Sequence, residues 1–305
     1  MSIKSDYVWM DGELVPYENA NVHVLSHTLH YGLGVFEGIR AYRQDDGTGG
    51  VFRLDEHIER LFDSARMCMI KIPFSRSEVR AACIETLKVN KLTEGYVRPL
   101  VFLGHGAMGL GARGNKVHLI VAVWPWGTYL GDEGMSRGIR AATSSFTRHA
   151  VNANLQRAKV TGHYVNSILA RYEANDNGYD EAIMLDHNGF VAEGTGENLF
   201  VVKGRKVKTP SITNILGGIT RQTSIEILNK LGYDVIETQF GRDALYVADE
   251  VFMTGTAAEI TPVREIDRRE VGEPGEVTLA VQKIYLDGVR GRVDWMIPMV
   301  TQYSV

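Results

Sequence analysis

Lys159 and the run at residues 192–200 are the parts of this chain whose residue types and spacing best predict chemistry. The amine of a lysine can form a Schiff base with an aldehyde. In the run, Glu193 stands beside Gly194 and Gly196, and tight glycine turns can hold its carboxylate against a protonated ring nitrogen. A pyridine ring that carries an aldehyde is the core of pyridoxal phosphate. The pair therefore predicts a site for this cofactor, although most lysines in proteins are solvated surface groups.

The composition is that of a globular protein with a small-molecule substrate. The chain has 305 residues, 44% of them hydrophobic and 23% charged, which is enough for two domains of ordinary size. The formal net charge is -4 with the two signs interspersed, so nothing in it favours nucleic acid or an anionic membrane as a partner.

The cysteines and the N-terminus predict a cytoplasmic protein. Cys68 and Cys83 both lie in apolar helical patterns, which argues against a disulfide framework and for a reducing compartment. The first six residues lack the apolar run of a signal peptide, and no apolar stretch is long enough to span a bilayer.

The first half of the chain has the pattern of an α+β unit. Asp11 and Gly12 between two β-prone runs predict a hairpin over residues 7–15. Apolar spacing then predicts helices from Leu54 to about Met69 and over 77–90. The strands that we expect cover residues 35–42, 51–53, 96–103 and 117–124.

The second half is predicted to be a separate, sheet-rich domain. Residues 126–134 have linker composition, so we expect a small domain over 1–125 and a larger one over 135–305 that carries Lys159. Helices are expected over about 164–174, from the glycine turn at 217–218 to Leu231, and around 277–289. The expected strands cover 139–143, 181–185, 198–202, 233–237, 250–253 and 260–266.

Several further features have both a functional and a structural interpretation. The turn at residues 217–220 opens a helix and can bind a phosphate, or it can be an ordinary loop. Residues 253–259 form a second small-residue turn with the same two interpretations. Arg60 can be a routine ion pair of a helix surface. Arg98, in an apolar strand, is either on a solvated face or an inward cation that awaits a carboxylate.

Two other patterns resemble cofactor or metal sites but do not fit them. The glycines at 32, 34 and 38 resemble a dinucleotide fingerprint, yet the third glycine comes one residue late and a strand follows. A nicotinamide enzyme is therefore a poor interpretation. His23, His27 and His30 have helical spacing, but no acidic or thiolate ligand set accompanies them, so we expect no metal site.

Taken together, the chain resembles the branched-chain amino acid aminotransferases, which are pyridoxal phosphate enzymes of fold type IV. The resemblance covers nearly the whole chain. Its carriers are residues 30–32, 35–40, 59–61, 96–100, Lys159, 193–200, 218–221 and 249–259. It implies an α+β fold of two domains, similar to D-amino acid aminotransferase: a small α/β domain, a larger domain with a barrel-like core, and the cofactor at the domain interface.

The resemblance also implies roles in cofactor binding and catalysis. Lys159 would form the Schiff base and move the proton at the substrate Cα. Glu193 would face the pyridine nitrogen, and Tyr164 would donate to the phenolate oxygen. The phosphate would be held by Arg60, by Thr256, and by the N–H groups of Ile219 and Thr220.

On the substrate side the resemblance implies one pocket for an apolar branched side chain and for the carboxylate of glutamate. Arg98 would meet the side-chain carboxylate of glutamate, and Tyr96 with the N–H groups of Thr256 and Ala257 would take the α-carboxylate. Met108 and Leu110 would close the pocket of a neighbouring subunit in a homodimer or homohexamer. The residues implied for the apolar wall are Tyr31, Phe36, Trp126, Tyr129 and Tyr164.

The implied reaction is reversible ping-pong amino transfer between L-leucine, L-isoleucine or L-valine and 2-oxoglutarate, which yields branched 2-oxo acids and L-glutamate. A nicotinamide oxidoreductase is the alternative enzyme of another class, and the absence of a yellow chromophore would favour it. The alternatives of the same fold are a D-amino acid transaminase, an R-selective amine transaminase and an aminodeoxychorismate lyase. The run at 96–100 argues against all three. A non-catalytic binding protein on this fold would need Lys159 or Glu193 replaced, and both are present.

Overall fold

A computed structural model describes residues 5–127 and 131–305. The chain forms two compact units. Unit 1 comprises residues 1–127, 158–163 and 288–305, and unit 2 comprises residues 128–157 and 164–287. This grouping differs from the sequential division expected from composition, because the segment that carries Lys159 and the C-terminal segment both pack with the first half. The isolated bridge between Val35 and Val160 is one of the contacts that hold the Lys159 segment there.

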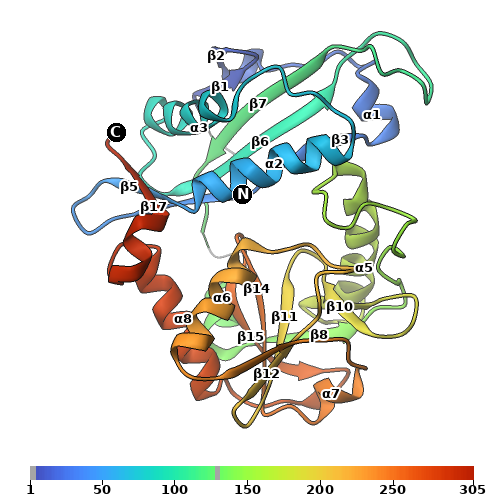
Figure 1. The fold of residues 1–305 in the computed structure, drawn as a ribbon, viewed down its shortest axis with the longest axis vertical. Coiled ribbons are helices and arrows are strands. Elements are labelled where there is room, and N and C mark those ends of the chain that lie inside the picture. Colours follow the sequence, from blue (N-terminus) through green and yellow to red (C-terminus); the bar gives the residue numbers. More distant parts are fainter. Residues whose placement is uncertain (1–4, 128–130) are drawn as a thin grey trace. The chain divides into compact units, whose positions relative to one another are not determined.

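Unit 1 is built on one sheet whose main path runs in the order β17-β5-β4-β6-β7-β1-β2, with β3 paired to β6 (Figure 1). The predicted hairpin is confirmed, since β1 and β2 pair around Asp11 and Gly12, which both have positive φ. The strands are β1 (Tyr7–Met10), β2 (Glu13–Pro16), β3 (Gly34–Phe36), β4 (Ile39–Arg43), β5 (Gly49–Phe52), β6 (Gly95–Leu103), β7 (Val117–Trp124) and β17 (Val300–Tyr303).

The two faces of this sheet have different chemistry. Alternate residues of β6 and β7, such as Val97 and Val121, pack against α2 (Leu54–Met67) and α3 (Arg76–Val89) in one apolar core. The other face carries Tyr96, Arg98 and Trp124, because side chains alternate along a strand and Tyr96 pairs directly with Trp124. The helices thus fix one face and leave the opposite face for polar and aromatic groups. The shorter helices of this unit are η1 (Tyr17–Asn19), α1 (His27–Tyr31), η2 (Thr161–His163) and η3 (Asp294–Met299).

Unit 2 contains a mixed sheet in the order β10-β9-β8-β15-β14-β11-β12-β13, with β16 paired to β15. Most neighbours are antiparallel, and the parallel pairs are β15 with β8, β8 with β9, and β12 with β13. The strands are β8 (Ile139–Thr143), β9 (Glu181–Leu185), β10 (Val191–Gly194), β11 (Asn198–Lys203), β12 (Lys206–Thr209), β13 (Asp234–Glu237), β14 (Glu250–Gly255), β15 (Glu259–Ile266) and β16 (Arg269–Glu270).

Three helices of unit 2 begin close to where the sequence predicts them: α5 (Tyr164–Asp176), α6 (Ile219–Lys230) and α8 (Glu276–Gly288). Two others were not predicted. Helix α4 (Gly131–Arg137) occupies part of the segment expected to be linker, and α7 (Asp243–Tyr246) follows β13. The expected class, α+β with a curled, barrel-like sheet in the second unit, is confirmed.

The expected strand over residues 35–42 is wrong in one respect, because it is divided into β3 and β4 at Glu37 and Gly38. Glu37 turns its carboxylate into the protein at this break. The glycines at 32, 34 and 38 lead into strands, as the sequence indicates, which removes the basis for a dinucleotide site.

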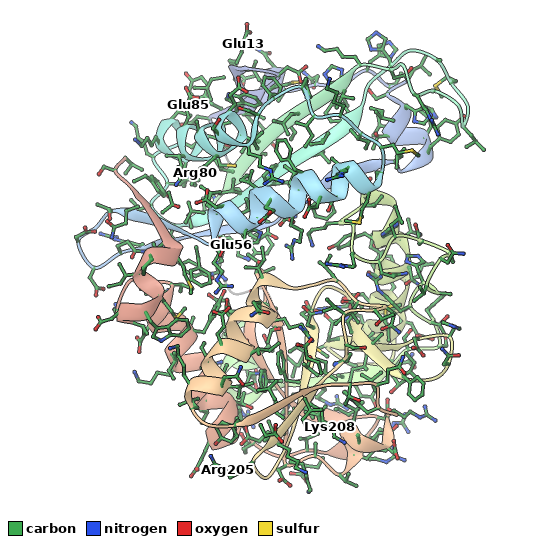
Figure 2. All side chains as sticks on the ribbon, in the orientation of Figure 1. Glu13, Glu56, Arg80, Glu85, Arg205 and Lys208 are labelled. Atoms are coloured by element: carbon green, nitrogen blue, oxygen red, sulfur yellow. The ribbon has the colours of Figure 1, made fainter. Side chains whose placement is uncertain are left out.

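Charged side chains such as Glu13, Glu85 and Arg205 lie at the outside of their own units (Figure 2). Cys68 and Cys83 are buried and free. Among the helices of residues 5–127 and 131–305, none combines the length and the hydropathy needed to cross a membrane.

Candidate active site

The backbone of Lys159 is held on both sides by other elements of unit 1. Its N–H donates to the Ser64 hydroxyl on α2 at 3.0 Å, and its carbonyl accepts from the N–H of Phe36 on β3 at 3.0 Å. The Nζ atom lies 5.0 Å from the centroid of the Phe36 ring. The amine is therefore presented from a fixed peptide beside an aromatic face.

Arg60, on α2, is oriented by a buried carboxylate. Its Nε and Nη2 atoms donate to the two oxygens of Glu37 at 2.6 and 2.9 Å, and His57 Nδ1 lies 2.7 Å from Glu37 Oε2. Burial by itself would raise the pKa of Glu37, but the charge of Arg60 and the hydrogen bonds from His57 and Arg60 hold it well below its ordinary value. Burial, with the nearby Arg60 and Lys159, outweighs Glu37 and lowers the pKa of His57. The guanidinium of Arg60 is therefore held in place by the ionised carboxylate of Glu37.

Replacement of Glu37 by Gln should destabilise the protein in a pH-dependent way. The lowered pKa means that the stability contributed by Glu37 is complete above the ordinary glutamate value and is lost as the pH falls through the folded-state value. At pH 7 we expect a loss of about 3 kcal/mol in the free energy of unfolding, because one partner of a buried pair is removed. Urea unfolding at pH 7 and at acid pH measures this.

In the same experiment the difference in the free energy of unfolding between wild type and E37Q should become smaller on acidification. A difference that stays constant would contradict the stabilising role of the ionised Glu37 carboxylate. Glu56→Gln is the matched control on the same helix. Its carboxylate is half exposed and 3.7 Å from Arg53, so the loss should stay below about 1 kcal/mol.

Arg98 lies in an aromatic box on the open face of β6 and β7. Its Cζ atom is 4.7 Å from the ring centroid of Phe36, 5.5 Å from Tyr96 and 5.6 Å from Trp124. Among the described residues no acidic side chain pairs with it, and its buried Nε has no hydrogen-bond partner. Of the two interpretations of Arg98, the geometry favours an inward cation suited to an external carboxylate.

The side chain of Tyr96 packs against Gly38, a glycine on the adjoining segment between β3 and β4. A Cβ atom on Gly38 would lie 1.9 Å from the Tyr96 hydroxyl. The Tyr96 ring also contacts Trp124 and Trp126, with centroid separations of 5.2 and 5.0 Å. Gly38 therefore provides the space in which the Tyr96 hydroxyl is positioned.

Tyr31, Met108 and Leu110 belong to an exposed part of unit 1. Gly109 N–H donates to the Tyr31 hydroxyl at 3.2 Å, and His27 Nε2 lies 2.9 Å from the Gly109 carbonyl. These bonds tie the loop at 104–114 to α1. Leu110 is 92% exposed and Met108 is exposed. Tyr129 lies outside the described residues.

In unit 2, Glu193 is turned away from the apolar core by an irregularity of its strand. The register between β10 and β9 shifts between Val191 and Glu193, so these two residues point to opposite faces. Val191 enters the core, whereas the buried Glu193 meets Arg148 Nε at 2.7 Å. Its other oxygen accepts from Asn198 Nδ2 at 3.2 Å and from the Leu216 N–H at 3.1 Å.

A second carboxyl, that of Glu197, lies close to Glu193. Burial and the neighbouring Glu181 raise the pKa of Glu197 above its ordinary value, which favours its neutral form. Glu181 is paired with Arg171 and accepts a hydrogen bond from the Thr195 hydroxyl at 2.7 Å.

The remaining candidates of unit 2 lie at two turns and one helix start. Ile219 and Thr220 are the first residues of α6, whose N-cap is Gly218, so their N–H groups have no partner within the helix. Thr256 and Ala257 follow β14 in a half-buried turn. Tyr164 is the first residue of α5. The candidates thus form two sets, one on each unit.

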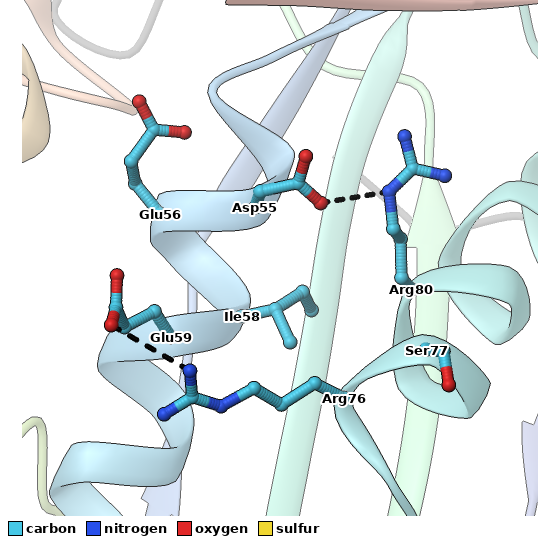
Figure 3. A pocket seen from close by; sticks show the side chains of 7 residues that line it. All are labelled: Asp55, Glu56, Ile58, Glu59, Arg76, Ser77 and Arg80. Atoms are coloured by element: carbon cyan, nitrogen blue, oxygen red, sulfur yellow. Dashed lines mark hydrogen bonds and ion pairs between the residues drawn. The ribbon is translucent and has the colours of Figure 1, made fainter.

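The cavity of about 390 Å³ between α2 and α3 is not part of either set. Four of its charged side chains form two ion pairs, Asp55 with Arg80 at 2.7 Å and Glu59 with Arg76 at 3.6 Å (Figure 3). The fifth, Glu56, also lines the cavity and pairs with Arg53 at 3.7 Å.

Comparison with known proteins places the chain in a family. The family model described as amino-transferase class IV matches residues 34–266, which is most of the chain. The chain belongs to this family. The class IV aminotransferase of Pseudomonas aeruginosa named "Branched-chain-amino-acid aminotransferase" is 49% identical over 296 residues, 96% of each chain.

Solved structures of class IV aminotransferases have the same fold. The branched-chain amino acid aminotransferase of Escherichia coli has a TM-score of 0.95 at 44% identity and covers 98% of this chain and 99% of its own. The branched-chain amino acid aminotransferase of Thermoproteus uzoniensis, solved with norvaline, has a TM-score of 0.93 at 42% identity with the same coverage. A further branched-chain amino acid aminotransferase, complexed with N-(5'-phosphopyridoxyl)-L-glutamate, has a TM-score of 0.94 at 44% identity, again with the same coverage.

The candidate residues of this class IV aminotransferase have the functional groups that pyridoxal phosphate, the cofactor of the family, needs. A fixed guanidinium and a helix start suit a phosphate, a buried carboxylate on an arginine suits a protonated ring nitrogen, and a lysine amine suits an aldehyde. The sequence did not assign roles to Glu37, His57, Arg148 or Asn198. A carboxylate in the apolar run at 35–39 was a usable signal for Glu37. Asn198 lies within the run at 192–200, but nothing in the sequence indicated its contacts, and Arg148 gave no signal.

Proposed function

We infer that this protein is a branched-chain amino acid transaminase that uses pyridoxal phosphate. It moves the amino group between L-leucine, L-isoleucine or L-valine and 2-oxoglutarate, giving the branched 2-oxo acid and L-glutamate. The observation that carries the substrate assignment is Arg98 in its aromatic box, together with the full-length similarity to enzymes of that name. An apolar pocket that holds one cation accepts both a branched side chain and a second carboxylate.

When bound, pyridoxal phosphate supplies an aldehyde carbon that takes the amino group and a ring that withdraws electrons from the substrate Cα. We propose that both sets of residues serve one cofactor. Arg60, the N–H groups of Ile219 and Thr220, and the Thr256 hydroxyl hold the phosphate. The carboxylate of Glu193, supported by Arg148, keeps the proton at the ring nitrogen. Tyr164 donates to the phenolate oxygen.

Lys159 has two successive tasks in this proposal. Its Nζ atom would hold the aldehyde carbon of the cofactor in the resting protein, and as a free amine it would move the proton at the substrate Cα. The fixed backbone of Lys159 keeps the amine on one face throughout. Proton transfer on a single face is what makes the reaction stereospecific.

The substrate is oriented by its α-carboxylate. We propose that the Tyr96 hydroxyl and the N–H groups of Thr256 and Ala257 bind this carboxylate, while Phe36, Tyr31, Trp126 and the Tyr164 ring line the apolar side. Tyr129 belongs to this set by family resemblance. In the second half of the reaction Arg98 binds the far carboxylate of 2-oxoglutarate.

The assay for this function follows both products. The purified protein with pyridoxal phosphate, L-leucine and 2-oxoglutarate should form L-glutamate and 4-methyl-2-oxopentanoate in equal amounts. Parallel reactions with D-leucine or with an (R)-amine in place of L-leucine should form no L-glutamate. Activity with either of these in place of L-leucine would assign the protein to a sister activity.

We also propose that the protein is a homo-oligomer, a dimer or a hexamer, in the cytoplasm. Exposed apolar side chains gather where α1 meets the loop at 104–114, and we call this group the α1 patch. It consists of Val24, Leu25, Leu29, Tyr31, Met108 and Leu110. A group of exposed apolar side chains on adjoining segments is typical of a protein interface. Free buried cysteines are consistent with a reducing compartment.

Replacement of Leu110 by Glu tests the α1 patch. A charge at this 92% exposed position is tolerated in a monomer but not in an apolar interface. We expect the mass measured by light scattering to fall to that of one chain, with activity reduced at least about tenfold because the pocket loses its neighbouring loop. Leu279→Glu, on α8 and 45% exposed, is the control. An unchanged mass for L110E would contradict the assignment.

A further inference from the structure

Asn198 lies at the junction of the elements that carry the unit 2 half of the proposed site. It is the first residue of β11, is 4% exposed, and pairs across the sheet with Thr254 of β14. Its Nδ2 atom donates to Glu193 Oε2 at 3.2 Å and to the Leu216 carbonyl at 3.0 Å. One amide nitrogen thus uses both of its hydrogens, one on the carboxylate of β10 and one on the turn that precedes α6.

The hydrogen bonds around Asn198 form a closed ring. The N–H of Leu216 donates to the same Glu193 oxygen at 3.1 Å, so Glu193, Asn198 and Leu216 are each bonded to the other two. In such a ring a displacement of one member strains two bonds rather than one. The carboxylate and the turn are therefore mechanically linked within unit 2.

Gly218 gives independent evidence that the amide of Asn198 must stay in this place. Its φ of -68° and ψ of 134° are accessible to any residue, so its backbone does not require glycine. A Cβ atom there would lie 2.0 Å from Asn198 Oδ1. The N-cap of α6 thus lacks a side chain in the space that the Asn198 amide occupies.

We propose that Asn198 is a positioning residue that makes the Glu193 carboxylate and the start of α6 act as one body, so that the ring nitrogen and the phosphate of the cofactor are bound cooperatively. This inference rests on the proposed function, because it uses the roles given there to Glu193, Ile219 and Thr220. Asn198 itself contacts neither the ring nor the phosphate in this proposal. It acts through both of its partners.

The test distinguishes binding of the cofactor ring from binding of its phosphate with two probes, pyridoxal phosphate and pyridoxal. Pyridoxal lacks the phosphate. The affinity for pyridoxal reports the ring contacts, and the ratio of the two affinities reports the phosphate contacts. The variant is Asn198→Asp, in which an oxygen replaces the donor, faces the Glu193 carboxylate and leaves the Leu216 carbonyl without its partner. Binding to cofactor-free protein is measured by absorption or by quenching of tryptophan fluorescence.

We expect N198D to weaken pyridoxal binding about tenfold and to reduce the affinity ratio by a further factor of about ten, as expected for the loss of hydrogen bonds to a charged group. If N198D changes only the pyridoxal affinity, only the affinity ratio, or neither of them, the proposed coupling is wrong. If wild-type protein binds no pyridoxal phosphate, the proposed function fails. If wild type binds and N198D binds equally well, only the role of Asn198 fails.

Asn214→Asp is the matched control for a merely structural effect. Asn214 is 5% exposed, lies in the same segment, and donates Nδ2 to a carboxylate, that of Asp186, at 2.6 Å. N214D should lower the melting temperature and leave both binding quantities within about twofold. If N214D reproduces the N198D result, general loosening of the segment explains it and the inference is wrong.

A second variant keeps the inference testable if N198D does not fold. Gly218→Ala removes no hydrogen-bonding group and displaces Asn198 from the opposite side. Pyridoxal lacks the phosphate that this helix start would bind, so weaker pyridoxal binding by G218A, by about tenfold, must come through Asn198 and Glu193. Unchanged pyridoxal binding by a folded G218A would overturn the proposal.

Discussion

Replacement of Lys159 by Ala should abolish amino transfer while the protein stays folded. The backbone bonds of this residue, to Ser64 and from Phe36, do not involve its side chain and remain in the variant. The side chain in the proposed mechanism both binds the cofactor and moves the Cα proton. We expect kcat to fall by at least about 10⁴, the upper end of what one proton-transferring group contributes.

The rate of glutamate formation from L-leucine and 2-oxoglutarate measures this effect, with the melting temperature as the test of folding. Lys159→Arg is the control for charge. It keeps a cation beside Phe36 but cannot deprotonate at working pH, so it should be as inactive as the alanine variant. Residual activity within about tenfold of wild type in either variant would refute the assigned role.

Replacement of Arg98 by Met should separate the two halves of the reaction. The methionine side chain preserves the volume of the box formed by Phe36, Tyr96 and Trp124 but removes the cation. The kcat/KM for L-glutamate and for 2-oxoglutarate should fall about a hundredfold, since a charged carboxylate is left without its partner. The value for L-leucine should stay within about fivefold.

Single-turnover measurement of each half-reaction gives these two values separately. Arg140→Met is the matched control, because that guanidinium is already committed to Glu265 in a two-bond pair at 2.9 and 3.0 Å. In R140M the ratio of kcat/KM for L-leucine to kcat/KM for L-glutamate should equal that of wild type. Equal losses for leucine and glutamate in R98M would show that Arg98 supports the pocket as a whole rather than selecting a carboxylate.

Local patterns predicted most of the elements, because turn chemistry and apolar spacing act over a few residues. The hairpin at Asp11 and Gly12 and the helix that follows Gly218 are examples. The grouping of the chain into units was not predictable in this way. It depends on contacts such as that of Val35 with Val160, which join residues far apart in the sequence.

The reactive groups of the site were easier to predict from sequence than their supports. Lys159 and Glu193 are recognised by residue type and motif. The contacts of Arg148 and Asn198 with Glu193 depend on burial and orientation, and neither property can be read from the sequence. The strand irregularity before Glu193 is a further case, since periodicity alone would place Val191 and Glu193 on the same face.

The absorption spectrum of the purified protein, recorded as L-leucine and then 2-oxoglutarate are added, decides whether the protein carries out both half-reactions. The yellow band of bound pyridoxal phosphate should disappear with L-leucine, as the pyridoxamine band rises, and 2-oxoglutarate should restore it. Each addition then reports one half-reaction on the same sample. A yellow protein that is silent to L-leucine but responds to a D-amino acid would contradict the substrate assignment. A protein that binds no pyridoxal phosphate would contradict the whole account.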